Sequence, residues 1–192
     1  MAWLVLGLIL FLGPHSLRGW GEGVRTALLG RLGEGPYKGL YSLATLGGFV
    51  LLIHGYGQAR LDPTVLYAPP VGGRHLSWLL MVASLVLLSV TYLPRSHLKQ
   101  AVGHPMMLGV GLWSVAHLLA NGTLADLLLF GGFLAWIGVS YPAARRRDRA
   151  SAATPPAPSW AVDALGIAVG VGLWCALAFH LHAWLFGVDP LA

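Results

Sequence analysis

The chain has 192 residues, of which 56% are hydrophobic and only 10% are charged, and its mean hydropathy is +0.69. Soluble domains carry about 25% charged residues, so this composition excludes a soluble globular class and predicts an integral membrane protein. Twelve Lys and Arg outnumber seven Asp and Glu, but they fall between apolar runs, which indicates a role in topology and no nucleic-acid binding. The single cysteine, Cys175, excludes an intrachain disulfide.

Six apolar segments are each expected to form a membrane-spanning helix, because a span needs about 20 mostly apolar residues. Backbone groups in lipid must be hydrogen-bonded internally, which runs of this length achieve as helices, and the alternation typical of barrel strands is not seen. The predicted fold is an all-α polytopic transmembrane bundle, a single domain over 1–192. The expected spans are 2–20, 37–56, 76–93, 105–120, 124–141 and 161–186.

The loops after the first, third and fifth segments hold ten of the twelve basic residues. By the positive-inside rule, these loops face the cytoplasm and both termini lie on the periplasmic side. No basic residue precedes the first apolar run and no small-x-small cleavage site follows it, so a retained helix is expected rather than a signal peptide. The basic residues of the three loops are Arg18, Arg25, Arg31, Lys38, Arg95, Lys99, Arg145, Arg146, Arg147 and Arg149.

Residues 145–159 begin with a basic cluster and continue as SAATPPAPS, whose prolines cannot continue a helix. This pattern predicts an orienting basic patch followed by a flexible cytoplasmic linker, with contact to anionic lipid as an addition and a protein partner as the other alternative. Further along, Gly166 and Gly170 form a GxxxG pair, which favours close packing within the bundle, with a homodimer face as the alternative.

The most informative residues are histidines inside apolar runs, because an ionisable group in lipid needs a partner and marks a functional site by default. His117 lies deep in the fourth expected span, with Ser114 three residues before it and Asn121 four residues after it on the same helical face. This polar stripe has two interpretations. It either holds helices together through hydrogen bonds, or it forms a site in which His117 binds haem or a metal.

His15 ends the first apolar run and is followed by Ser16 and, one turn later, by Arg18. One interpretation is a histidine near the cytoplasmic membrane face that is bonded to Ser16 or to a neighbouring carbonyl. The other is an iron ligand, with Arg18 or Arg25 pairing with a haem propionate through charge-assisted hydrogen bonds.

A rival haem or metal site on the outer side would combine His117 with His54, His180 or His182. The sequence shows no acidic pair within a span, no Walker-type loop and no Ser–His–Asp arrangement, so nothing in it supports a soluble-enzyme mechanism. The residues interpreted as solvated histidines are His75 and His97, and those interpreted as ordinary helix-start carboxylates are Asp126 and Asp163.

Three stretches of the sequence resemble the NnrU family of bacterial membrane proteins. They are the opening LGLILFLGPHSLR, the tract YKGLYSLATLGG and the segment HPMMLGVGLWSVAHLLANGTLADLLLFGGFLAW, and the likeness covers nearly the whole chain. The resemblance implies a multi-pass protein of the bacterial cytoplasmic (inner) membrane that is linked to denitrification and nitric oxide metabolism. Besides the lipid bilayer, it implies membrane redox or denitrification proteins as partners.

The NnrU family is related to 15-cis-ζ-carotene isomerase, a plastid membrane enzyme that uses haem b. The haem ligands of that enzyme are histidines in an early HS motif and in a WxxAH motif that follows an HP pair. The HS motif stands here at His15, the WxxAH motif at Trp113 to His117, and the HP pair at His104. The resemblance therefore implies His15 and His117 as the axial ligands of haem b.

Ser114 stands where the isomerase has a cysteine that is thought to exchange with a histidine ligand, so redox-switched ligand exchange is not expected here. Helix geometry places His15 and His117 at depths that differ by roughly 10 Å, which makes His104, closer to His15 in depth, a substitute ligand. The HP-x-x-x-G fragment is also similar to isoprenylcysteine-type membrane methyltransferases, but their acidic motif near the C-terminus is not matched, and this interpretation ranks third.

The working hypothesis is a haem b-binding membrane protein of the NnrU type. The alternatives are a haem-dependent cis–trans isomerase of the carotenoid type and a haem-free membrane assembly or regulatory protein, in which the histidines only bridge helices. The candidate cofactor-site residues are His15, His117, Ser114, Arg18, Asn121 and His104, and the candidate metal ligands are His15 and His117.

Overall fold

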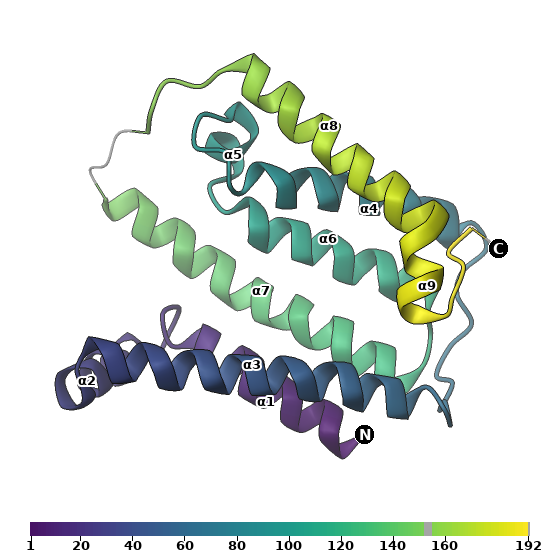
Figure 1. Ribbon diagram of the computed structural model, residues 1–192, viewed down its shortest axis with the longest axis horizontal. Helices are drawn as coiled ribbons and strands as arrows, with labels where there is room; N and C mark the ends of the chain where they lie inside the picture. The colour runs from purple at the N-terminus through teal and green to yellow at the C-terminus, as the bar shows by residue number, and fades with distance from the viewer. Residues whose placement is uncertain (152–154, 192) are drawn as a thin grey trace.

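The computed structural model of the protein describes residues 1–151 and 155–191. In these ranges the chain is helical and its only β-type contact is an isolated bridge between Val65 and Thr123, so the all-α prediction is confirmed. The elements, in chain order, are α1 (Ala2–Ser16), α2 (Glu22–Leu32), α3 (Glu34–Ala59), α4 (Gly73–Val90), α5 (His97–Val102), α6 (Pro105–Ala120), α7 (Leu124–Ala150), α8 (Trp160–Ala176), the π-helical turn η1 (Leu177–Leu181) and α9 (His182–Phe186) (Figure 1).

Each predicted span contains one long helix, and the short helices α2 and α5 lie outside the predicted spans. Helix α7 continues past Tyr141 and Pro142, through the basic cluster, and ends at Ala150. The beginning of the predicted 145–159 linker is therefore helical. Residues 152–154 of that linker lie outside the described residues.

Four helical segments are long and apolar enough to cross a membrane, namely Glu34–Ala59, Gly73–Val90, Leu124–Ala150 and Trp160–Phe186. Helices α1 and α6 have 15 and 16 residues. At 1.5 Å per residue they reach about 23 Å, against about 30 Å for the hydrocarbon core of a bilayer. The structure thus supports four of the six predicted spans by length and composition, and six crossings stay a prediction.

The long helices pack side by side in a row that does not follow the chain order (Figure 1). Helix α1 packs between α3 and α7, α6 packs between α7 and α4, and α8 packs against α4. Along the direction of the helix axes, both termini lie on one side of the bundle, and α2, α5 and the end of α7 lie on the opposite side (Figure 1). The basic loops therefore gather at the end opposite the termini, as the predicted topology requires; which end faces the cytoplasm stays a prediction.

Helices α1 and α3 approach each other closely because glycines remove side chains from their contact. A Cβ atom on Gly48 would lie 2.6 Å from the backbone nitrogen of Phe11, and one on Gly55 would overlap the backbone of Leu4. Small residues at such crossings let helix backbones come within van der Waals contact, which drives helix association in lipid.

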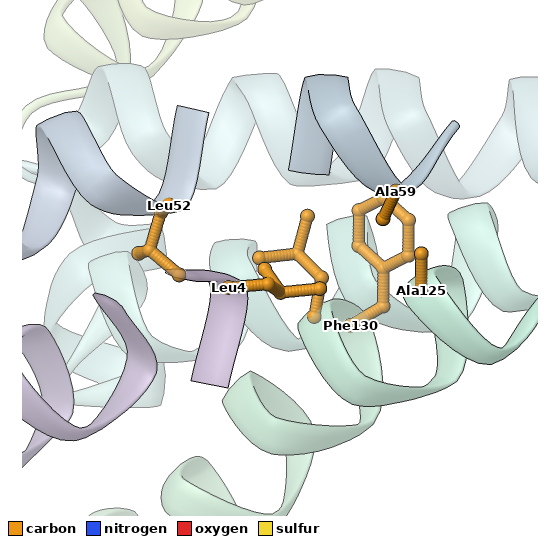
Figure 2. Close-up of a cluster of buried hydrophobic side chains, with 6 residues drawn as sticks. Leu4, Leu52, Ala59, Ala125 and Phe130 are labelled. Carbon is orange, nitrogen blue, oxygen red and sulfur yellow. The ribbon is translucent and has the colours of Figure 1, made fainter. Parts of the chain in front are cut away.

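The largest buried cluster joins α1, α3 and α7 near the N-terminus. Leu4 of α1 is fully buried and points between Leu52 and Ala59 of α3 and Ala125 and Phe130 of α7 (Figure 2). In lipid, such a cluster stabilises the fold through packing contacts, because lipid chains are as apolar as the side chains themselves.

Hydroxyl groups on α4 hold α6 in place. The Ser84 hydroxyl donates a hydrogen bond of 2.7 Å to the Gly109 carbonyl, and the Ser77 hydroxyl donates one of 2.6 Å to the Ala116 carbonyl. Both serines are buried. Side-chain hydroxyls are satisfied in this way when water is absent, so the two bonds fix the register of α4 against α6.

The GxxxG pair of α8 faces α4. A Cβ atom on Gly170 would lie 2.5 Å from the Cα of Val86, and one on Gly166 would lie 2.5 Å from the Cγ1 of Val90. The prediction that this pair serves packing within the chain is confirmed, because both glycines are buried against α4.

Asp126 ties the start of α7 to α3. It forms a capping box with Thr123, whose backbone N–H donates to the carboxylate at 2.9 Å, and it accepts a hydrogen bond of 2.6 Å from the Tyr56 hydroxyl. Asp126 is 4% exposed. It is a helix-start carboxylate, as predicted, but its contact with Tyr56 also makes it a bond between helices.

Hydrogen bonds connect the C-terminal segment to α3 and α4 on the side of the bundle where the termini lie. Arg60, at the end of α3, donates a hydrogen bond of 3.1 Å to the Phe186 carbonyl, and the Trp78 indole of α4 donates one of 3.0 Å to the Pro190 carbonyl. The first of these bonds joins the end of α3 to α9.

The variant Gly170→Ala is expected to destabilise the protein by about 1–3 kcal/mol, because the added methyl group meets the backbone of Val86 and α8 must move away. Gly172→Ala is the matched control, since nothing lies within 4 Å of its added Cβ. Denaturation of the purified variants in detergent, followed by circular dichroism, measures the difference. Equal stability of the two variants would contradict the assigned packing of α8.

The variant Asp126→Ala is expected to cost about 2–3 kcal/mol, because it removes a helix cap and leaves the Tyr56 hydroxyl without its acceptor. The same denaturation assay measures this cost, with Asp62→Ala at an exposed position as the control. The double variant Asp126→Ala with Tyr56→Phe tests the pair directly. Additive effects of the two substitutions would show that the contact between them contributes nothing.

Candidate functional site

The first candidate ligand, His15, lies in the last turn of α1, directly after Pro14. Proline has no backbone N–H, so the Leu10 carbonyl lacks its usual helical donor, but the helix continues through Ser16. The His15 Nδ1 donates to the Phe11 carbonyl at 2.6 Å, and the Ser16 hydroxyl donates to the Leu12 carbonyl at 2.6 Å. The hydrogen-bond partner of His15 is therefore a neighbouring carbonyl and not Ser16.

Aromatic side chains from three helices surround the His15 ring. It stacks on Phe11 at 4.6 Å between ring centroids, and it also contacts Tyr41 of α3 at 5.5 Å and Trp136 of α7 at 6.2 Å, the latter edge-on. The ring is half-buried. These contacts hold the imidazole plane in one orientation between α1, α3 and α7.

The second candidate ligand, His117, lies in the last turn of α6, which begins at Pro105 with His104 as its N-cap. The His117 Nδ1 donates a hydrogen bond of 2.8 Å to the Trp113 carbonyl. The ring stacks on Phe130 of α7 at 4.5 Å and lies 5.1 Å from the Trp113 ring.

The two other members of the predicted polar stripe also bond within α6. The fully buried Ser114 hydroxyl donates to the Val110 carbonyl at 2.9 Å, and the Asn121 side-chain amide donates to the His117 carbonyl at 3.0 Å. Neither side chain bonds to the His117 ring. The helix-to-helix bonds predicted for this stripe come instead from the serines of α4 and from Tyr67, whose hydroxyl donates to the carbonyls of Leu118 and Asn121.

His15 and His117 share one arrangement of their ring nitrogens. In each, Nδ1 carries the proton that the carbonyl four residues earlier accepts, which leaves Nε2 with its lone pair. Neither Nε2 has a hydrogen-bond partner in the part of the chain that the structure describes. An imidazole held in this way presents one nitrogen in a fixed direction, as ligating histidines do.

An aromatic cluster lies between the two imidazoles and joins α1, α6 and α7. Its members are Phe11, Trp113, Phe130 and Phe133. Phe133 connects its two halves, with its ring centroid 5.8 Å from Phe11 and 5.6 Å from Trp113. The cluster therefore occupies the space through which the two candidate ligands would meet.

The two imidazoles lie at different depths along α7. His117 stacks on Phe130, whereas His15 contacts Trp136, and the six positions between these residues correspond to about 9 Å along a helix axis. This agrees with the depth difference expected from helix geometry. The structure brings both histidines to α7, but it places no direct contact between their rings among the described residues.

The two predicted propionate partners differ in what they bond to. Arg25 forms an ion pair of 2.7 Å with Glu22 inside α2. Arg18 is exposed and has no ion-pair partner within residues 1–151 and 155–191. Of the two arginines, Arg18 is therefore the one whose side chain is not already in an ion pair among the described residues.

His104, the substitute ligand, lies at the opposite end of α6 from His117. Its Nε2 is 3.0 Å from the Asp148 carboxylate of α7, which also lies 3.6 Å from Arg145. The His104 ring contacts Tyr141 at 6.3 Å. His104 therefore lies between α6 and α7 near the basic cluster, its buried Nε2 makes no hydrogen bond in the described residues, and its contacts do not include His15.

Among the histidines of the rival site on the outer side, His182 lies close enough to His117 to interact with it electrostatically, but none of the three bonds to the His117 ring in the described residues. His54 and His180 are exposed, and the His182 Nδ1 donates a hydrogen bond of 2.7 Å to the Val188 carbonyl. Over the same residues, no group of three or more His, Cys, Asp or Glu side chains could hold a metal ion. A haem with two axial histidines needs only two such side chains, so the absence of a larger group does not bear on it.

A buried donor beside His15 lacks a partner. The Trp136 Nε1 is buried and makes no hydrogen bond in the described part of the chain. Because roughly 90% or more of buried polar groups are bonded, such an orphan points to an acceptor that the polypeptide does not supply. Its position next to His15 makes it part of the candidate site.

Sequence reasoning missed a second polar cluster, at the junction of α5 and α8. His97 is not merely solvated: its Nδ1 lies 2.6 Å from the carboxylate of Asp163. Asp163 is 3% exposed and comes from a helix start 66 positions further along the chain. No local pattern pairs two residues so far apart, so only the packing of α8 on α4 and α5 reveals the pair.

A protein-family profile described as "NnrU protein" matches residues 3–190, which is nearly the whole chain. No curated protein and no solved structure matches the sequence. The resemblance carried by the three motifs is therefore confirmed over the full length of the helices described above, and the chain belongs to the NnrU family.

Proposed function

We propose that this NnrU-family chain is an integral membrane haem b protein of the bacterial cytoplasmic membrane, with His15 and His117 as the axial ligands. In this proposal it serves redox metabolism linked to nitric oxide and denitrification, and its partners are membrane redox or denitrification proteins. The link to nitrogen oxides rests on the family resemblance. The ligand assignment rests on residues of this chain.

The observation that carries the proposal is the matched hydrogen bonding of the two imidazoles. Both Nδ1 atoms donate to a backbone carbonyl four residues earlier, and both Nε2 atoms are left without a partner in the described residues. Histidines that ligate a metal almost always donate their other ring N–H to a carbonyl or carboxylate, which fixes the tautomer and the ring orientation. Two histidines in membrane helices with this arrangement suit the two axial positions of haem iron.

The residues around His15 fit the polar edge of a haem. The unpartnered Trp136 N–H is a buried donor, and Arg18 is a cation without an ion-pair partner among the described residues. A propionate carboxylate can accept bonds from both types of group. When bound, haem would supply one-electron chemistry at its iron, and the chain's own residues would hold and orient it.

The aromatic cluster sets a condition on loading. Phe11, Phe133 and Trp113 connect the two imidazoles through ring contacts, so a haem that bridges His15 and His117 needs these rings to make room for it. The same rings would then line the porphyrin, whose faces favour aromatic and apolar neighbours.

The membrane arrangement that we propose is six crossings, with both termini in the periplasm. Helices α1 and α6 pack between longer helices, so local thinning of the bilayer or flanking polar residues can accommodate their shorter length. The gathering of basic residues at the end opposite the termini supports this orientation.

A second candidate function is a haem-free membrane assembly or regulatory protein. The filled space between the imidazoles favours it, because stacking on Phe11 and Phe130 already gives both rings neighbours. A carotenoid isomerase has only the family relationship behind it, and the bond of Ser114 to the Val110 carbonyl offers no ligand to exchange.

Purified protein is expected to show a Soret band with one haem b per chain, and both His15→Ala and His117→Ala are expected to abolish it, because each removes an axial ligand. Absorption spectra of oxidised and reduced samples measure this. His54→Ala is the matched control, since His54 is an exposed histidine on a neighbouring helix.

The substitution His117→Met adds a test that does not depend on loss of binding. Methionine also ligates haem iron and raises its reduction potential, so this variant should keep haem with a shifted spectrum and a higher potential. A stable, colourless wild-type preparation that takes up no added haem would instead establish the haem-free candidate.

A further inference from the structure

The polar cluster at α5 and α8 is centred on His97 and the buried carboxylate of Asp163. The Asp163 carboxylate accepts hydrogen bonds from the Ser96 hydroxyl at 2.6 Å, from the His97 backbone N–H at 3.2 Å and from the His97 Nδ1 at 2.6 Å. The backbone N–H of Leu98 adds a longer bond of 3.4 Å. So many donors fix both carboxylate oxygens, and the carboxylate in turn fixes the His97 ring.

The remaining nitrogen of His97 is available to a ligand. With Nδ1 donating to Asp163, the neutral imidazole presents a lone pair on Nε2, and that atom has no partner in the described residues. The His97 ring stacks on Trp160 at 4.1 Å with an interplanar angle of 20°, so its plane is held from two directions. A histidine oriented by a carboxylate in this way is a strong hydrogen-bond acceptor.

A cavity of about 350 Å³ lies against this pair and is lined by residues of α5 and α8. The wall of the cavity is almost wholly apolar, and His97 and Asp163 are the two titratable residues among those that line it. The residues that line it include His97, Leu98, Ala101, Trp160, Asp163 and Ile167. The volume lies within the range of small-molecule sites, of about 300–1,000 Å³.

Two apolar residues that line the cavity are exposed on α8. Trp160 is 76% exposed and Ile167 is 45% exposed, so apolar surface leads from the surroundings of the helix to the cavity. Trp160 begins a helix that is long and apolar enough to cross the membrane, and tryptophan is typical of the membrane interface. A molecule dissolved in the bilayer can therefore enter from the side.

The charges of the cluster favour a neutral ligand over an anionic headgroup. The carboxylate of Asp163 is part of the lining, and the nearby cations bond elsewhere. Arg95 donates to the Ala157 carbonyl at 3.0 Å, and Lys99 donates to the Thr91 carbonyl at 2.6 Å. The Asp163 carboxylate would repel a phosphate group, and no basic side chain among the lining residues would offset that repulsion.

We propose that this cavity binds the hydroxyl-bearing ring of a lipid-soluble aromatic molecule of the quinol class, with the His97 Nε2 accepting the hydroxyl hydrogen bond and the ring lying against Trp160. Asp163 is the positioning residue that holds the His97 tautomer. The site is separate from the proposed haem site and does not depend on it.

Decylubiquinol, kept reduced under anaerobic conditions, is the probe, and the full-length chain in lipid nanodiscs is the sample. Isothermal titration, corrected for empty nanodiscs, is expected to show one saturable site. His97→Ala should weaken binding about tenfold, the effect of one lost hydrogen bond. The matched control is His75→Ala, because His75 also packs against a tryptophan, Trp78, at 4.9 Å but has no carboxylate partner among the described residues.

Two further arms keep the test decisive if His97→Ala folds poorly. Ile167→Trp fills the cavity without touching the polar pair and should abolish binding, while decylubiquinone, which lacks the hydroxyl donor, should bind about tenfold more weakly than the quinol. The proposal is overturned if the wild type shows no saturable binding, if Ile167→Trp binds as the wild type does, or if the quinone binds as tightly as the quinol. Tighter binding of dodecyl phosphate, an anionic probe, would overturn it as well.

Discussion

The close approach of α1 and α3 at their glycines determines the position of the candidate haem site. Gly48 lies against the backbone of Phe11, and Phe11 supplies both the carbonyl that holds His15 and a ring that stacks on it. Phe133 of α7 packs against Phe11 and carries the contact on to α6. Since lipid provides no hydrophobic force between helices, the missing side chain of Gly48 is what lets these rings come together.

The other half of the row is held by bonds of a different kind. There, buried hydroxyls of α4 bond to carbonyls of α6, and α8 lies on α4 through Gly170. The first turn of α8 is positioned by Asp163, which accepts hydrogen bonds from Ser96 and His97 at the start of α5. The proposed quinol cavity thus lies at α5 and α8, whereas the proposed haem ligands lie on α1 and α6.

Features that local sequence patterns encode could be predicted, and features that depend on packing could not. Apolar runs identified the helices, Pro105 marked the start of α6, and the GxxxG spacing indicated packing of α8. The order of the helices in the row, and with it the pairing of His97 with Asp163, depends on contacts far apart in the chain. The ion pair of Arg25 with Glu22 is different, because its i, i+3 spacing was a local signal that could have removed Arg25 from the propionate partners.

The hydrogen bond from Arg60 to the Phe186 carbonyl gives the fold unequal ends. It joins the end of α3 to α9 near the termini, so the first and last parts of the chain contact each other there. At the far end the described residues offer no such tether between α2 and α8. The side of the bundle near the termini therefore has a cross-link between the first and last parts of the chain that the arginine-rich side lacks in the described residues.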